Sequence, residues 1–178
     1  FLLDSAHGEL HHWVGSGEWR NDIPDSTACY YRLYTFHDMH CLLAAYEEML
    51  TQYGSMKEYI RLNATTGIEA VSALCRFFAE RGASKIVPKN TSSACKRVCM
   101  FLRWMVREGS DVDLGLWADI IDRRTLIMPL DTHVVQEANR MGLLNSRTAS
   151  MSTARRLTDA MLEVFPDDPL KGDFALFG

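Results

Sequence analysis

Helical spacing of apolar residues runs through nearly the whole chain, and this pattern limits the folds that the chain can adopt. No segment shows the sustained alternation of apolar and polar residues that predicts a half-buried strand. Residues 65–82, TTGIEAVSALCRFFAERG, are typical of the chain. Thr66 and Glu69 have the spacing of a capping box, an apolar stripe follows, and Gly82 closes the helix. The sequence therefore predicts an all-α, multi-helix protein.

The rest of the chain divides into further helices and their connections. Pro88 breaks the connection formed by residues 83–93, and residues 123–129 are expected to be a linker. Gly54 and Gly142 stand just past the ends of two predicted helices. We expect these further helices over residues 26–54, 55–62, 94–108, 111–120, 131–141, 153–165 and 168–178.

Length and composition allow one compact domain or two lobes that share a cleft. The chain has 178 residues, 47% of them hydrophobic, which is enough for a substantial core. We expect a partly irregular N-terminal segment over residues 1–24 and a single helical domain over residues 25–178. Because the chain starts without Met and stops inside the apolar stretch DFALFG, we expect it to be a piece of a longer protein.

The composition does not indicate a membrane protein or an oxidising compartment. No apolar run approaches the roughly 20 residues that a membrane span needs, and the opening FLLDSAHGELHHW lacks the basic start of a secretory signal. The five cysteines include no Cys-x-x-Cys pair, which argues against a disulfide scaffold and a structural zinc site. His37 and His40 have a spacing that can hold a metal, but we interpret them as core or surface histidines. We therefore expect a soluble cytoplasmic protein with buried thiols, no cofactor and no metal.

The charged residues are segregated along the chain. The formal net charge is -4, yet residues 81–107 hold seven basic residues and no Asp or Glu. The other 12 of the 19 basic residues and all 23 acidic residues lie elsewhere. One positive segment on an acidic protein is the pattern of a phosphate-binding face, although a solvated loop and helix would give the same pattern.

Two residues at predicted helix starts are the candidates for chemistry. Asp131 precedes the helix THVVQEANRM, where its carboxylate is expected to cap unpaired amides. Lys96 falls in the first turn of the helix CKRVCMFLRWMVR, where unpaired amides favour an anion such as a phosphate. An unprotonated lysine amine is a competent nucleophile toward a carbon with carbonyl character. The plainer interpretation, that Asp131 is only a cap and Lys96 a solvated lysine, stays open.

The segments around Asp131 and Lys96 resemble one protein superfamily. LDTHVVQEANRMGLL resembles the Asp-bearing segment of the helix-hairpin-helix DNA glycosylases, the endonuclease III and 8-oxoguanine glycosylase superfamily. CKRVCMFLRWMV is similar to the helix that starts at the catalytic Lys in the archaeal 8-oxoguanine branch, and Lys96 precedes Phe-Leu-Arg by the same five residues. The tail LTDAMLEVFPDDPLKGDFALFG is similar to the closing helices of that domain. This match covers about residues 85–178.

A closer resemblance is to an uncharacterised bacterial family of conserved hypothetical proteins. That family has ACKR…FLRWMVR, VDLGLW, PLDTHV and DFALFG in the same order, and the match covers roughly residues 25–178. The resemblance to the glycosylases implies a DNA-glycosylase-like helical domain with a cleft between two helical lobes.

The resemblance also implies an activity, that of a DNA glycosylase and AP lyase. Lys96 would attack the anomeric carbon of a damaged nucleotide, expel the base and form a Schiff base that permits strand cleavage. Asp131 would help to activate the amine and would stabilise positive charge on the sugar. Damaged or abasic DNA is then the expected partner, and the target base must leave the duplex. The residues expected to contact DNA are Lys89, Asn90, Ser92, Ser93, Arg97, Arg103 and Arg107.

The chain departs from the glycosylase pattern in two places. The hairpin before the Lys is glycine-rich in the glycosylases, whereas VPKNTSSACK contains no glycine. Lys96 and Asp131 lie 35 positions apart, farther than in the glycosylases, and residues 107–128 are expected either to line a distinct pocket or to displace the pair. Two other functions stay open: a nucleic-acid-binding domain that keeps the fold without turnover, and a plain helical interaction domain. The sequence predicts neither the target base nor the oligomeric state.

Overall fold

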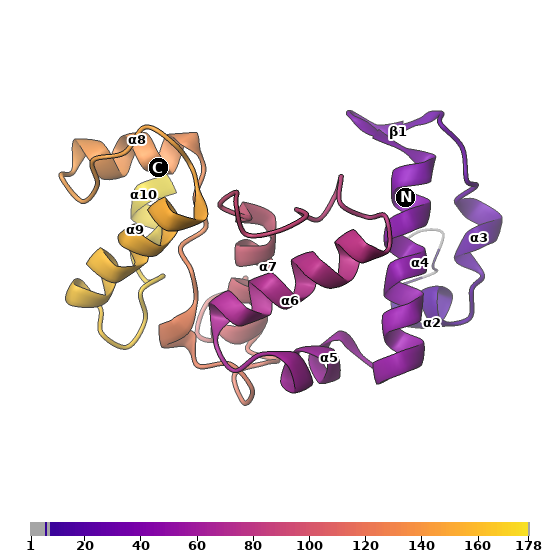
Figure 1. The fold of residues 1–178 in the computed structure, drawn as a ribbon. Coiled ribbons are helices and arrows are strands. Elements are labelled where there is room, and N and C mark those ends of the chain that lie inside the picture. Colours follow the sequence, from indigo (N-terminus) through magenta and orange to yellow (C-terminus); the bar gives the residue numbers. More distant parts are fainter. Residues whose placement is uncertain (1–5, 7, 178) are drawn as a thin grey trace. The chain divides into compact units, whose positions relative to one another are not determined.

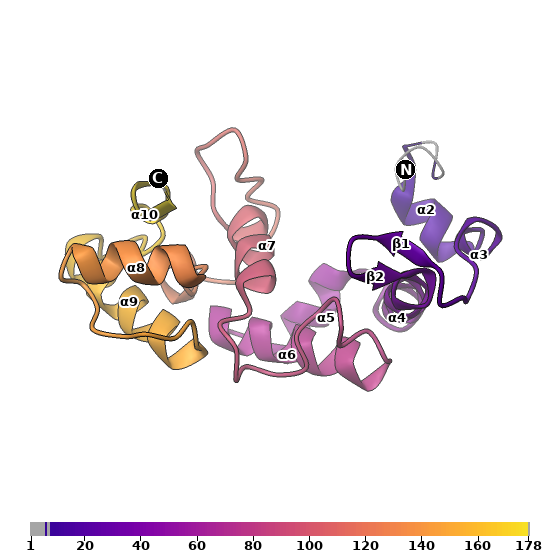
Figure 2. The same cartoon turned by 90° about the horizontal axis from the view of Figure 1, so that it is seen from above.

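The chain folds into two compact units that are built mostly of helices (Figures 1 and 2). The computed structural model describes residue 6 and residues 8–177. The first unit comprises residues 1–59 and 75–89, and the second comprises residues 60–74 and 90–178. The helices that contribute residues to both units are α5 (Met56–Asn63) and α6 (Gly67–Glu80). Both agree with the helices predicted over residues 55–62 and 65–82.

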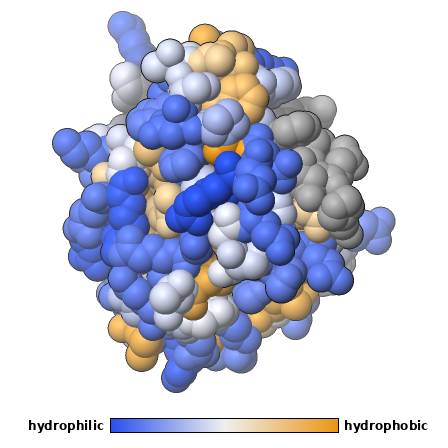
Figure 3. All heavy atoms as spheres, turned by 90° about the vertical axis from the view of Figure 1, so that its right-hand side faces the viewer, coloured by the Kyte–Doolittle hydropathy of each residue, from blue (hydrophilic) through white to orange (hydrophobic). Residues whose placement is uncertain are grey.

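The first unit packs short N-terminal helices against one long helix. Its elements are α2 (Leu10–Gly15), α3 (Trp19–Asp22), β1 (Cys29–Tyr31), β2 (Tyr34–Thr35) and α4 (Phe36–Tyr53). The indoles of Trp13 and Trp19 lie in its core, and Trp19 Nε1 donates to Glu47 Oε2 at 2.9 Å. Figure 3 shows one face of the protein, which is mostly hydrophilic, with apolar atoms at the top, near the centre and along the lower edge.

The predicted helix over residues 26–54 is wrong in its first part. Residues 29–35 form an antiparallel hairpin of β1 and β2 instead. Helix α4 begins only at Phe36, because Thr35 and Asp38 form a capping box. The Asp38 amide donates to Thr35 Oγ1 at 3.2 Å, and the Thr35 amide donates to Asp38 Oδ2 at 2.7 Å. The tyrosines ahead of this cap favour a strand, so the all-α prediction holds for most of the described chain but not for this hairpin.

The second unit contains the helices on which the predicted site residues lie. Its elements are α7 (Lys96–Val106), the 3-10 helix η1 (Arg123–Thr125), α8 (Thr132–Arg140), α9 (Met151–Val164) and α10 (Asp173–Phe177). Helices α8, α9 and α10 lie side by side in both ribbon views. The predicted helices over residues 94–108, 131–141 and 153–165 are confirmed by α7, α8 and α9.

The helix predicted over residues 111–120 does not form. Two amides of this segment donate to α7: the Leu114 amide to the Trp104 carbonyl at 2.6 Å, and the Trp117 amide to the Met105 carbonyl at 2.7 Å. The bonds that stay within the segment, such as the Ala118 amide to the Gly115 carbonyl at 3.2 Å, span three residues and form turns. Tertiary hydrogen bonds therefore replace the local ones that a helix would need, and the segment runs along α7 as an irregular loop.

The final helix begins later than predicted. We expected Asp168 to start a helix over residues 168–178, but α10 starts at Asp173. The Asp168 carboxylate accepts the Leu170 amide at 3.1 Å and closes a turn. The same carboxylate also binds Arg107, which holds it away from a helix start.

Two expectations about the chain as a whole can be compared with the structure. None of the helices among residues 8–177 is long and apolar enough to cross a membrane. None of the five cysteines forms a disulfide. Cys75, Cys95 and Cys99 are buried as expected, whereas Cys29 is exposed and Cys41 is only partly buried, so the expectation of buried thiols is wrong for these two.

Candidate functional site

Asp131 stands between a buried extended segment and a helix. Residues 126–130 before it are buried, and the Met128 amide donates to Thr158 Oγ1 of α9 at 2.9 Å. Asp131 Oδ1 then accepts the Val134 amide at 2.9 Å, which is the predicted cap of α8. The two contacts hold the Asp131 carboxylate in a fixed position within the second unit. The cap uses only Oδ1, so Oδ2 can bind another group.

Lys96 is the first residue of α7, as the sequence predicts. The helix is anchored by a buried face that includes Val98, Cys99 and Leu102. Burial raises the pKa of the Cys99 thiol to about 12, so the thiol stays protonated and donates to the Ala94 carbonyl at 3.5 Å. The buried face and the Cys99 hydrogen bond therefore hold the start of α7 in place, and the Lys96 side chain extends from a fixed backbone.

The two helix starts bring the amine and the acid together. Lys96 Nζ donates to Asp131 Oδ2 at 2.5 Å, and the two side chains are 31% and 35% exposed. Burial alone would raise the pKa of Asp131, but the hydrogen bonds from Lys96 and from the Val134 amide outweigh it, so this pKa lies below its ordinary value of 3.8. Asp131 is therefore both the cap of α8 and the partner of Lys96, at a place that solvent reaches.

A loop without glycine leads into Lys96. Cys95 takes the left-handed conformation, with φ of 48°, that glycine would take at lower cost. Its thiol donates to the carbonyls of Asn90 and Ser93 at 3.3 and 3.4 Å. Asn90 Oδ1 accepts the Ser92 amide at 3.0 Å. Side-chain bonds to the backbone therefore shape this loop, which contains no glycine.

Arg103 does not belong to the expected DNA-binding face. Its side chain is 1% exposed, with Nη1 3.0 Å from Asp173 Oδ2 and Nη2 3.6 Å from Asp113 Oδ2. Burial raises the pKa of Asp173, and the charge of Arg103 opposes this shift. Arg103 is a buried structural cation, so the prediction that it contacts DNA is wrong.

Arg107 is also paired with carboxylates of the same chain. Its Nε and Nη2 donate to the Asp168 carboxylate at 3.1 and 2.7 Å, a two-pronged contact that matches the planar guanidinium. Its Nη1 donates to Asp113 Oδ2 at 2.8 Å. With its side chain 11% exposed, Arg107 ties α7 to the chain ahead of α10, and the prediction that it contacts DNA is wrong as well.

The other residues predicted to contact DNA are accessible. Ser93 pairs with Ser150 in an isolated antiparallel bridge, which fastens the loop to the start of α9. Lys89 is the last residue of the first unit, whereas the other four belong to the unit that holds Lys96 and Asp131. Their contact with DNA stays a prediction. The exposed residues of the set are Lys89, Asn90, Ser92, Ser93 and Arg97.

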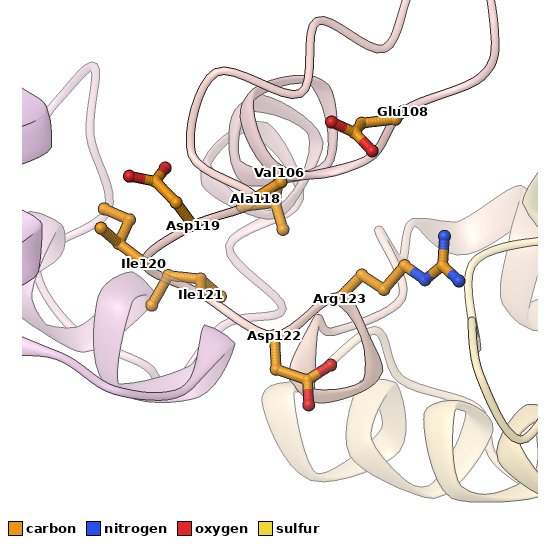
Figure 4. Close-up of a pocket in the computed structure, with 8 residues that line it drawn as sticks. All are labelled: Val106, Glu108, Ala118, Asp119, Ile120, Ile121, Asp122 and Arg123. Atoms are coloured by element: carbon orange, nitrogen blue, oxygen red, sulfur yellow. The ribbon is translucent and has the colours of Figure 1, made fainter.

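A cavity of about 600 Å³ lies at the far end of α7 (Figure 4). Its lining includes Val106, the last residue of α7, which lies about 15 Å from Lys96 along the helix axis at 1.5 Å per residue. The cavity is therefore separate from the Lys96–Asp131 pair. Of the two expectations for residues 107–128, the lining of a distinct pocket agrees with the structure, and displacement of the pair does not. The lining residues are Val106, Glu108, Ala118, Asp119, Ile120, Ile121, Asp122 and Arg123.

Sequence reasoning missed the acidic partners of the two arginines. Asp113, Asp168 and Asp173 come from three separate segments, and no local motif relates them. One signal was present, because Arg103 stands one turn after buried Cys99 and therefore at the edge of the buried face of α7.

The two histidines singled out for their spacing have different partners. His37 Nδ1 bonds the Asp25 carboxylate, and His37 Nε2 lies 3.5 Å from Cys41 Sγ. His40 Nδ1 bonds the Ile23 carbonyl at 3.2 Å, and its ring packs edge-on against Trp19. In the described part of the chain, no group of three or more His, Cys, Asp or Glu is arranged to hold a metal ion.

Comparison with known proteins gives a family without an assigned activity. A protein-family model described as "Protein of unknown function (DUF2400)" matches residues 2–178. No curated protein and no solved structure matches the chain.

Proposed function

We propose that the chain, which belongs to the DUF2400 family, acts on DNA as a glycosylase with associated lyase activity. One observation carries the proposal: the Lys96 amine and the Asp131 carboxylate meet at 2.5 Å where solvent reaches both. An amine nucleophile with an adjacent carboxylate is the pair that attack on a sugar carbon needs. The motifs that surround these two residues also resemble those of the lysine-bearing glycosylases.

In the first step, Lys96 loses one proton to water and its neutral amine attacks C1′ of the target nucleotide. The nitrogen then releases a second proton, which balances the proton that the leaving base takes up. The bond from C1′ to the base breaks, and the base leaves with the electron pair and takes up a proton. Positive charge grows on the sugar as the base departs, and the Asp131 carboxylate stabilises it. Because Oδ1 is already held by the Val134 amide, the carboxylate needs little rearrangement when this charge develops.

In the second step, the bound sugar opens. The C1′–O4′ bond breaks, O4′ takes its electron pair and a proton, and the attached nitrogen becomes a Schiff base with C1′. Loss of a proton from C2′ then expels the 3′ phosphate and cuts the strand. Water hydrolyses the Schiff base and returns Lys96 to its starting form.

Contact with the DNA backbone falls to the exposed loop ahead of α7. Asn90, Ser92 and Ser93 offer hydroxyl, amide and backbone donors, and Arg97 adds a charge in the first turn beside Lys96. A helix start that carries unpaired amides also favours a phosphate. These contacts would offset the few kcal/mol that extrusion of a base costs.

The test is borohydride trapping on an oligonucleotide with one abasic site. Wild-type protein is expected to give a covalent adduct, because borohydride reduces the Schiff base to a stable amine. Lys96→Ala is expected to give none. Asp131→Asn keeps an N-cap oxygen and removes the charge, so it is expected to slow trapping without unfolding the protein. Lys89→Ala, which retains the pair, is the matched control and is expected to trap at wild-type level once DNA is saturating.

Two outcomes would overturn the proposal. If wild-type protein shifts the oligonucleotide in a gel at low salt but never traps it, the chain is a nucleic-acid-binding domain without turnover. If it neither traps nor shifts DNA, the helical interaction domain is the remaining function.

A further inference from the structure

The second unit has an acidic region with the opposite charge from the segment around Lys96. The basic segment of the chain ends at Arg107, and the next fifteen positions, residues 108–122, contain no Lys, Arg or His. Four of the acidic residues are exposed, and Asp113 is buried against Arg107. The acidic residues of this segment are Glu108, Asp111, Asp113, Asp119 and Asp122.

The same region exposes large apolar side chains. Two side chains of the loop, those of Asp113 and Trp117, are buried in the protein. The three apolar residues between and before them therefore point away from the core. The exposed fractions are 48% for Val112, 59% for Leu114, 57% for Leu116 and 40% for Trp104 of α7.

This exposed loop is held rigidly. The amides of Leu114 and Trp117 are bonded to carbonyls of α7. The Trp117 indole packs edge-on against Phe101, with ring centroids 5.3 Å apart, and the Asp113 carboxylate binds Arg107 at 2.8 Å. A partner that binds here would pay little to order the loop, which favours binding.

The cavity at the end of α7 also combines apolar and acidic side chains. Figure 4 shows Val106 and Ile121 toward its centre, with the carboxylates of Glu108, Asp119 and Asp122 and the guanidinium of Arg123 around them. Asp122 is already paired with Arg124. A long basic side chain still suits the cavity, because its aliphatic stem can cover the apolar atoms while its charged end meets the carboxylate of Glu108 or Asp119.

We propose that residues 104–123 are a docking surface for a basic amphipathic segment of a partner protein. Exposed apolar side chains rimmed by charged residues are typical of protein interfaces, and the charge of the rim selects the sign of the partner. The acidic rim repels the phosphates of nucleic acid, so this surface is distinct from the DNA-binding loop. The partner segment is a helix with leucines on one face and lysines or arginines on the other.

The probe is a fluorescent helical peptide of about 18 residues with this pattern. Its binding to the whole chain is measured by fluorescence anisotropy at several salt concentrations. We expect saturable binding that weakens with salt, and no binding of a peptide in which every lysine is replaced by glutamate. Leu114→Ser with Leu116→Ser is expected to weaken binding at least tenfold, because the two leucines supply most of the apolar contact.

Matched variants separate this surface from general attraction to an acidic protein. Leu62→Ser removes an equally exposed leucine of α5 and is expected to leave binding unchanged. Asp111→Lys is expected to weaken binding several-fold, whereas Glu163→Lys, which makes the same charge change on α9, is expected to have little effect. All five substituted side chains are exposed, so the variants are expected to fold, and circular dichroism against the wild-type chain checks this.

Three results would overturn the docking surface. The first is that the wild-type chain does not bind the peptide. The second is that the Leu62 variant and the double leucine variant lose peptide affinity equally. The third is that the chain self-associates and that the double leucine variant abolishes this self-association. The last result, measured by light scattering, would assign the surface to a second copy of the chain. Binding of the peptide by Lys96→Ala, which lacks the proposed nucleophile, separates this inference from the DNA activity.

Discussion

At the scale of single residues, Asp131 has two tasks that two substitutions can separate. One oxygen caps α8 and the other binds Lys96. Asp131→Ala removes both contacts and is expected to lower the free energy of unfolding by about 1 kcal/mol through loss of the cap. Asp131→Asn keeps the cap and is expected to cost clearly less. Urea unfolding followed by circular dichroism measures both, and equal losses for the two variants would argue against the cap.

Arg103 is the residue whose substitution should be most damaging. Its guanidinium is buried between Asp113 and Asp173, and removing it leaves two buried carboxylates with less compensating charge. Arg103→Met, which keeps much of the volume, is therefore expected to destabilise the protein by about 3–5 kcal/mol. Arg97→Met, on the exposed side of α7, is the control and is expected to change stability by less than about 0.5 kcal/mol. Comparable losses in thermal unfolding would contradict the buried role.

Lys96 and Asp131 could be predicted because local signals mark both of them. A polar residue before a helical stripe predicts a cap, and a lysine in the first turn of an amphipathic helix is visible in the sequence. Arg103 was misplaced because its partners lie on other segments, brought together only by folding. Cys95 was also beyond prediction, since its left-handed backbone depends on the shape of the whole loop.

At the scale of elements, the start of α4 depends on one charged side chain. The Lys85 amine, together with the Thr35 amide, holds the pKa of Asp38 at about 2, below the ordinary value of 3.8. The ionised carboxylate therefore stabilises the fold above about pH 4, and this contribution is lost as the pH falls toward 2. Asp38→Asn is expected to lower the melting temperature near pH 6 and to leave it nearly unchanged near pH 2.

Thermal unfolding by circular dichroism across this pH range tests the role of Asp38. Asp111→Asn, which changes an exposed carboxylate outside any helix, is the control and is expected to shift the melting temperature little at either pH. A difference between wild type and Asp38→Asn that persists unchanged at pH 2 would contradict the assignment.

Periodicity predicted the long amphipathic helices and failed where tertiary contacts decide. Helices α6, α8 and α9 each have an apolar face and a side-chain cap or capping box in the sequence, so their local signals agree. Residues 111–120 have apolar residues, but the Leu114 and Trp117 amides donate to α7, and residues 29–35 carry aromatic residues that pair across a hairpin. In both places, hydrogen bonds to another segment outweigh helical propensity: to α7 in the first case, and to the facing strand of the hairpin in the second.

At the scale of the whole molecule, most of the basic segment over residues 81–107 is paired with carboxylates of the same chain. Of the seven in residues 81–107, five form ion pairs inside the protein: Arg81, Lys85, Lys96, Arg103 and Arg107. Lys89 and Arg97 are exposed, and they are the two residues of this segment that we expect to contact phosphates. The logarithm of the DNA affinity is therefore expected to fall with the logarithm of salt concentration with a slope of about -2, since each phosphate contact contributes about -0.9.

Lys89→Ala should reduce the steepness of this salt dependence by about one and should weaken binding at low salt. Anisotropy titrations of a labelled duplex at several salt concentrations give the slope. Glu163→Gln, remote in sequence from the basic segment, is the control. A slope near -6 for the wild-type chain would mean that the internal ion pairs open to bind DNA.

The charge segregation was visible in the sequence, but its meaning was not. Composition alone counted seven cations as available for a partner, whereas folding assigns most of them to carboxylates of the same chain. Burial and pairing are properties of the tertiary structure, and no count of charged residues reveals them.

The double use of one carboxylate has a consequence for how this position is inherited. A descendant that had lost its chemistry would still need an oxygen at position 131 to begin α8, so an aspartate or asparagine there reports on folding alone. Lys96 is the first residue of α7 but does not cap this helix, so folding constrains the residue type at position 96 less than at position 131. If the proposed reaction occurs, replacement of the lysine beside a retained aspartate among related sequences would mark the lineages that have lost it.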